Sequence, residues 1–168
     1  MSEQQKKITI LLWTTIIASA MSFFGFVYEE IDFIPNYFSL TPIEAKIHWN
    51  SFHSLTNPAF YHIPPSIIAI FSITMIWFYK QHLSNRQIGK LRAASIMIIL
   101  INILTGMAVT QINDKLYFNL PVNDSESVKD LAKIWAILNF IRLSFTAICT
   151  VILVKMFSIK LVINSSKE

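Results

Sequence analysis

Charged residues are scarce in this chain: they make up 14% of its 168 residues, whereas hydrophobic residues make up 54%. With a mean hydropathy of +0.51, this composition lies outside the range of soluble domains. Only three glycines are present, and no low-complexity tract occurs, which excludes fibrous and disordered classes. We therefore predict an integral membrane protein with a single domain, residues 1–168.

The chain also lacks a second cysteine. Cys149 cannot form an intramolecular disulfide, which excludes the membrane dithiol oxidoreductases, because their chemistry needs paired cysteines. The net charge of +4 does not form a basic stripe, so nucleic acid is not an expected partner. Membrane lipid is the expected environment, and the sequence does not identify an oligomer or a partner protein.

Four apolar stretches are long enough to cross a bilayer as helices. A signal peptide is the alternative for the first, because Lys6 and Lys7 precede its apolar core, but the apolar run continues to full spanning length. The predicted fold is all-α, an integral membrane four-helix bundle with a partly folded outer loop between the first two helices. The predicted spans are residues 8–28, 64–80, 91–111 and 132–156.

The distribution of basic residues predicts the orientation of these spans. Nine of the fourteen lie in the N-terminal segment, the loop 80–92 and the C-terminal segment. By the positive-inside rule, both termini of this multi-pass protein are predicted to be cytoplasmic, in the cell membrane. The nine are Lys6, Lys7, Lys80, Arg86, Lys90, Arg92, Lys155, Lys160 and Lys167.

The outer segment 28–64 is rich in aromatic and isoleucine residues, so we expect it to fold onto the helices rather than to remain fully solvated. Thr41-Pro42 predicts the start of a short amphipathic helix at the membrane surface, and Asn57-Pro58 predicts its end.

Arg142 places a formal charge inside the last apolar stretch. Trp135 lies seven residues before Arg142 and Asn139 three residues before it, and Thr146 lies four residues after it. At these spacings all four side chains share one helical face. An arginine near the middle of a bilayer helix costs at least about 2.5 kcal/mol, and such a residue usually faces a bundle interior with a partner. This face is predicted to line the interior.

Glu29 is the predicted partner of Arg142. It continues a face of small residues that includes Ser22 and Gly25, whereas Glu30 is predicted to point elsewhere. Measured from the apparent helix ends, Glu29 and Arg142 differ by about 13 Å along the bundle axis, so a direct contact requires a tilt or an unwound helix end. The pair has two interpretations: a structural ion pair, or an arginine that binds a ligand oxygen.

Three histidines, His48, His53 and His62, lie in the outer segment. Their spacings give no tight ligand pair, so no metal site is predicted. His53 or His62 could instead act as a general base above the Arg142 face. Asn102 belongs to a polar face of the third helix, where interhelical hydrogen bonding is the alternative to ligand contact.

Several motifs spread over most of the chain support a resemblance. They are Tyr28-Glu29-x-x-Asp32-x-Ile34-Pro35-Asn36-Tyr37, Trp49 to Phe52 followed by Asn57-Pro58-Ala59-Phe60, Tyr117-Phe118, and Trp135-x-x-x-Asn139-x-x-Arg142. With these motifs the chain resembles the DUF1772, or anthrone-oxygenase-like, family of four-helix membrane proteins. The resemblance implies an intramembrane arginine near the outer side. For the few characterised fungal relatives it implies oxidation of a polycyclic phenol by oxygen, without an evident metal or flavin.

Two main functions follow from this sequence. The first is a cofactor-independent, oxygenase-like membrane enzyme that binds a lipophilic aromatic or quinone-like molecule near the outer leaflet. The second is a non-enzymatic subunit or lipid-binding partner whose polar interior is structural, and a small proton-coupled transporter is a weaker third. In the first, the catalytic candidates are Arg142, Asn139, Glu29, His53 and His62, and the substrate-binding candidates are Trp135, Trp49, Phe60, Tyr28 and Asn102.

Overall fold

All the secondary structure in the described part of the chain is helical. The computed structural model describes residues 2–41, 43–44, 47–48, 51, 55, 59–112 and 125–165; side chains are described for these except at 37, 59–60, 125–129 and 157–165. The elements are α1 (Glu3–Tyr28), η1 (Glu29–Phe33), α2 (Ile34–Ser39), α4 (Ala59–Phe78), η2 (Lys80–His82), α5 (Asn85–Met107) and α6 (Ser125–Ser165).

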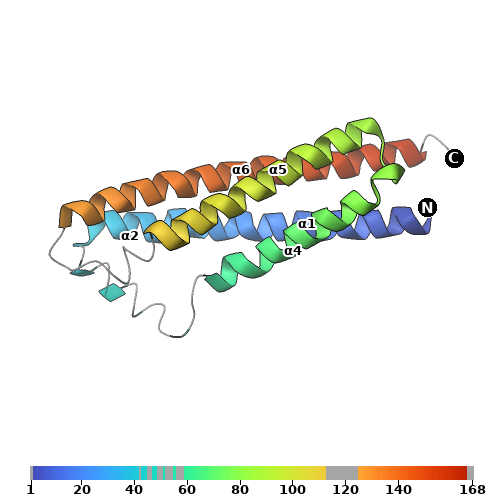
Figure 1. Cartoon of the computed structure of the whole chain (residues 1–168). Helices are drawn as coiled ribbons and strands as arrows, with labels where there is room; N and C mark the ends of the chain where they lie inside the picture. The colour runs from blue at the N-terminus through green and yellow to red at the C-terminus, as the bar shows by residue number, and fades with distance from the viewer. Residues whose placement is uncertain are drawn as a thin grey trace.

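The four predicted spans are confirmed as helices that are long and apolar enough to cross a membrane. They lie side by side along the bundle, and the start of α1, the end of α6 and the η2 connection lie at the same end (Figure 1). We call this the terminal end and the opposite one, where α2 lies, the α2 end. In the described residues, α1 packs against α4 and α6, and α5 packs mainly against α6.

Local sequence signals explain where two of the helices begin. Ser2 with Gln5, and Ser84 with Gln87, form capping boxes in which each side chain bonds the other residue's backbone amide. In the segment between α2 and α4, the amide and hydroxyl of Thr41 donate to the Glu44 carboxylate at 2.9 and 2.7 Å. These bonds, the side-chain one foremost, lower the pKa of Glu44, and they agree with the predicted helix start at Thr41.

The second span begins earlier than predicted, at Ala59 rather than at residue 64. Pro64 and Pro65 therefore lie inside α4, where they remove two backbone donors. The prediction placed the helix start at these prolines because proline is favoured in a first turn. The five additional residues carry His62 into the bundle.

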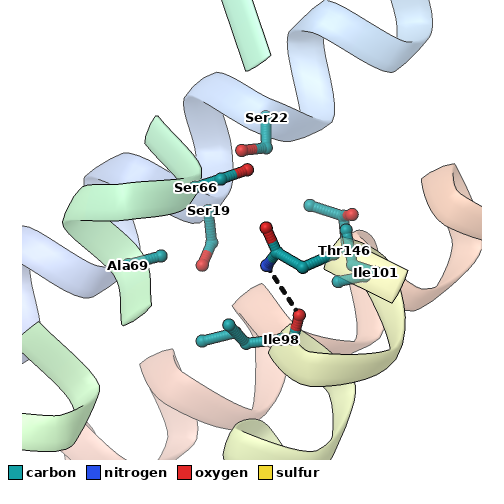
Figure 2. A pocket seen from close by; sticks show the side chains of 8 residues that line it. Ser19, Ser22, Ser66, Ala69, Ile98, Ile101 and Thr146 are labelled. Carbon is teal, nitrogen blue, oxygen red and sulfur yellow. Dashed lines mark hydrogen bonds between the residues drawn. The ribbon is translucent and has the colours of Figure 1, made fainter. Parts of the chain in front are cut away.

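Midway along the bundle, small polar side chains take the place of large apolar ones. Together with an alanine and two isoleucines, they line a small cavity of about 20 Å³ between all four long helices. Figure 2 shows serines of α1 and α4 facing α5 and α6 across it. Its lining residues are Ser19, Ser22, Ser66, Ala69, Ile98, Ile101, Asn102 and Thr146.

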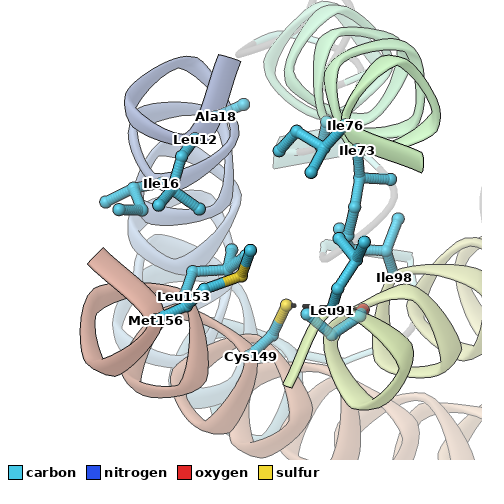
Figure 3. Packing of buried hydrophobic residues seen from close by; sticks show 12 residues of the cluster. Leu12, Ile16, Ala18, Ile73, Ile76, Leu91, Ile98, Cys149, Leu153 and Met156 are labelled. Carbon is cyan, nitrogen blue, oxygen red and sulfur yellow. Dashed lines mark hydrogen bonds between the residues drawn. The ribbon is translucent and has the colours of Figure 1, made fainter. Parts of the chain in front are cut away.

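Apolar side chains fill the bundle on the terminal side of this cavity (Figure 3). The cluster draws on all four helices, with Leu12, Ile76, Leu91 and Leu153 each at most 1% exposed. Outward-facing positions are also apolar: Phe24 of α1 and others are more than half exposed in the isolated chain, as expected for helices surrounded by lipid.

Candidate functional site

A charged cluster joins three helices between the cavity and the α2 end. Arg142 of α6 donates from Nη2 to Oε2 of Glu29 at 3.1 Å. The other carboxylate oxygen of Glu29, Oε1, lies 2.9 Å from Nε2 of His62 on α4. Arg142 is 2% exposed, Glu29 6% and His62 8%, so the whole cluster is buried. The predicted Arg142–Glu29 pair is therefore present, and His62 belongs to it.

The 13 Å axial separation expected for this pair is wrong. That estimate used Lys7 and Lys155 as the common inner boundary of the two helices. In the structure α1 begins at Glu3, and α6 continues beyond Lys155 to Ser165, so the two lysines do not mark one level. The contact is direct, with 3.1 Å between Arg142 and Glu29.

Glu29 opens a π-helical turn, η1, which continues α1 with more residues per turn. Glu30, the second residue of this turn, also faces α6. The amide of Asn139 donates to Oε1 of Glu30 at 2.9 Å and to the backbone carbonyl of Phe26 at 3.2 Å. The prediction that Glu30 points elsewhere, which assumed a regular α-helix, is wrong.

Asn139 connects these contacts to the arginine. Its Oδ1 accepts a 2.8 Å hydrogen bond from Nη2 of Arg142, so one guanidinium nitrogen serves both Asn139 and Glu29. Asn139 is fully buried. Asn139 and Arg142, which belong to the same sequence motif and are both catalytic candidates, are in direct contact.

Phe26 provides the apolar wall of the cluster. The guanidinium carbon of Arg142 lies 4.6 Å from the centre of its ring, and the His62 ring stacks on it at 4.9 Å with an interplanar angle of 16°. Gly25 lets His62 approach α1, because a Cβ at this position would meet Cε1 of His62 at 3.0 Å. The sequence reasoning missed Phe26, although it lies four residues after Ser22 and three before Glu29.

Trp135 lies two helical turns before Arg142, on the same face of α6, toward the α2 end. It is 4% exposed and packs with Phe33 of η1 at a ring-centre distance of 6.1 Å, tilted by 41°. Ala108 and Ile112 of the third span complete this small apolar cluster. The predicted interior face, from Trp135 to Thr146, is buried along its whole length.

Three buried polar atoms around the cluster have no hydrogen-bond partner among the described residues. They are Nε of Arg142, Nδ1 of His62 and Nε1 of Trp135. A buried polar group without a partner costs about 1–3 kcal/mol, and such groups are rare in folded proteins. Nε of Arg142 and Nε1 of Trp135 are hydrogen-bond donors, whereas Nδ1 of a neutral His62 ring is an acceptor.

The arrangement of Glu29 fixes the chemistry that His62 can perform. A carboxylate only accepts hydrogen bonds, so Nε2 of His62 donates to it, and the remaining nitrogen, Nδ1, carries a free lone pair when the ring is neutral. A carboxylate that orients an imidazole in this way is the arrangement of a general base. Of the two histidines predicted as a general base, His62 therefore shares Glu29 with Arg142.

The remaining candidates lie elsewhere. Tyr28 is 42% exposed and contacts Phe33 edge to face at 5.6 Å. Asn102 lines the central cavity and not the charged cluster. Phe60 belongs to α4, but its side chain lies outside the described residues, as do Trp49 and His53 entirely.

Within the described ranges, no group of three or more His, Cys, Asp and Glu side chains could hold a metal ion. The fold and the cluster together define a class, a multi-pass helical membrane protein with a buried Arg–Glu–His cluster. No protein-family model matches the chain, and neither a curated protein nor a solved structure is significantly similar to it. The resemblance to the DUF1772 family stays a prediction.

Proposed function

We propose that this protein binds a lipophilic aromatic or quinone-like molecule at the charged cluster, near the outer leaflet of the cell membrane. The enzymatic form of this proposal is a cofactor-independent, oxygenase-like activity of the kind found in the anthrone-oxygenase-like family. The observation that carries it is the three unpartnered polar atoms of Arg142, His62 and Trp135. Arg142 and His62 belong to the charged cluster, which contains four of the five predicted catalytic residues, and Trp135 lies two helical turns from Arg142 on the same face of α6.

The chemistry of these atoms defines the expected ligand. Nε of Arg142 and Nε1 of Trp135 are donors, so they fit carbonyl, phenolic or enolate oxygens. Nδ1 of the neutral His62 ring is an acceptor, so it fits a phenolic hydroxyl and could remove its proton. A developing oxyanion would be stabilised by the guanidinium in surroundings that exclude water. An aromatic molecule with oxygen substituents meets all three requirements.

A second function, a non-enzymatic membrane subunit, is supported by a different observation. Both carboxylate oxygens of Glu29 are already occupied, by Arg142 and by His62, and Phe26 covers the guanidinium. Among the described residues, the lining of the central cavity includes neither Arg142 nor His62. In this reading the cluster only fastens α1, α4 and α6 to one another.

Native mass spectrometry separates the two functions. The protein is extracted gently with its own lipids, and the molecules bound to the parent are compared with those bound to Trp135→Phe and His62→Gln. Trp135→Phe keeps a large apolar side chain, and His62→Gln keeps a polar side chain of similar size. Both variants leave the Arg142–Glu29 pair in place. Arg92→Gln, an exposed residue at the terminal end, is the matched control.

Binding of an aromatic, oxygen-bearing molecule that is lost in Trp135→Phe or His62→Gln, but kept in Arg92→Gln, is the expected result. A parent that carries only bulk lipid, or a bound molecule that all variants retain, would refute the proposal. Thermal stability measured on the same samples reports any general loss of fold.

A further inference from the structure

The central cavity is a second polar site, separate from the charged cluster and from the proposed function. Ser66 follows His62 by one helical turn on α4, and Thr146 follows Arg142 by one turn on α6. The cavity therefore lies about 5–6 Å further toward the terminal end. Its volume of about 20 Å³ exceeds the roughly 10–15 Å³ that, on the same measure, one water molecule needs.

The side chains around this cavity leave hydrogen-bonding capacity unused. Asn102 donates from Nδ2 to the backbone carbonyl of Ile98 at 2.8 Å, so its Oδ1 remains available as an acceptor. The hydroxyl groups of Ser22 and Ser66 make no hydrogen bond within the described part of the chain, and Ser22 is 7% exposed. Thr146 donates to the Arg142 carbonyl at 2.7 Å and keeps its acceptor capacity.

We propose that this cavity binds one water molecule, which accepts from the hydroxyls of Ser22 and Ser66 and donates to Oδ1 of Asn102. Water matches a site with both donors and acceptors and room for one molecule. No carboxylate is among the described residues that line the cavity, so a sodium ion would place an uncompensated charge in the interior, one turn from the cationic Arg142.

The water would connect helices that otherwise have few contacts. In the described residues, α5 packs mainly against α6 and less closely against α4. Within the described residues, a side-chain hydrogen bond between Trp77 of α4 and Ser95 of α5, at 2.9 Å, lies nearer the η2 connection. A water held by Ser22, Ser66 and Asn102 links α5 to α1 and α4 in the middle of the membrane, where bulk water cannot make this link.

Solid-state NMR of the whole protein in lipid nanodiscs tests this site. In a sample labelled with ¹⁵N-asparagine, magnetisation transfer from water to the side-chain amide of Asn102 is measured, and the signal is assigned by its absence in Asn102→Gln. Ser66→Val fills the cavity. Ser144→Val is the matched control, because Ser144 lies on the exposed side of α6.

The expected result is a transfer peak in the parent and in Ser144→Val that is lost in Ser66→Val. Should Ser66→Val fail to fold, Ser22→Ala, which removes one hydroxyl without adding volume, is expected to weaken the peak at least about twofold. The proposal is overturned if the parent shows no peak, or if the peak is unchanged in the folded cavity variants. A shift of the Asn102 signals when choline replaces sodium would assign the cavity to a cation and also overturn it.

Discussion

The Arg142–Glu29 pair makes a specific prediction about non-additive stability. Both side chains are almost completely buried, with exposed fractions of 3% and 7%, so neither charge can be hydrated when its partner is removed. Arg142→Met leaves the Glu29 carboxylate with only His62 as a partner. Glu29→Gln leaves the guanidinium with Asn139 and the Phe26 ring. Each single change is expected to cost about 3–5 kcal/mol of unfolding free energy.

The double variant Arg142→Met with Glu29→Gln removes both of the fully buried charges, and Glu30, which is only half-buried, keeps the amide of Asn139 as its hydrogen-bond donor. Replacing a buried ion pair by neutral groups of similar volume is commonly neutral or stabilising, so the double variant is expected to lie within about 1 kcal/mol of the parent. The two changes should therefore be non-additive by about 3 kcal/mol or more. Unfolding by SDS in mixed micelles, followed by the fluorescence of the four tryptophans, measures all three variants.

An exposed ion pair on the same helix provides the control. Lys133 and Asp130 also lie in contact, at 3.0 Å, but their side chains are 63% and 66% exposed. Lys133→Met and Asp130→Asn are expected to be additive within about 1 kcal/mol. If the costs of the Arg142 and Glu29 changes also add, so that the double variant is as unstable as the sum, the reasoning from buried charge is refuted.

Two further predictions concern packing and orientation. Gly25→Ala is expected to destabilise the fold by about 1–3 kcal/mol, because the added methyl group displaces the His62 ring. Gly89→Ala is the control: its methyl group meets nothing within 4 Å, so it should be neutral or slightly stabilising in the same unfolding assay. Equal effects of the two changes would contradict the close approach of His62 to Gly25. Ser84→Cys in the η2 connection should react with a membrane-impermeant maleimide only after the cell membrane is opened, because this end of the bundle is predicted to be cytoplasmic. The native Cys149 is buried and should not react. Labelling of Ser84→Cys in intact cells would reverse the predicted orientation.

The fold was predictable because hydrophobic length alone identifies membrane spans. The face of α6 from Trp135 to Thr146 was also predictable, since a charged residue in an apolar helix must face the interior, and helical periodicity then places its neighbours. Glu29 followed from the small-residue face of α1. These inferences depend on local spacing, which the sequence displays directly.

The geometry between helices was not predictable in the same way. The level at which Glu29 meets Arg142 depends on where both helices end, and the position of Glu30 depends on the π-turn, which no residue type in η1 signals. His62 reaches the cluster because α4 begins before its two prolines. The stacking of His62 on Phe26 is a contact between distant segments, which a single sequence does not specify.

The most direct test of ligand binding at the cluster is an experimental map of the protein purified with its own lipids, in nanodiscs and with a bound antibody fragment to aid alignment. The account predicts elongated non-protein density within hydrogen-bonding distance of Nε of Arg142 and of at least one of Nδ1 of His62 and Nε1 of Trp135. A map in which protein side chains or single waters satisfy these three atoms would contradict it, and would leave the cluster as a structural connection between α1, α4 and α6.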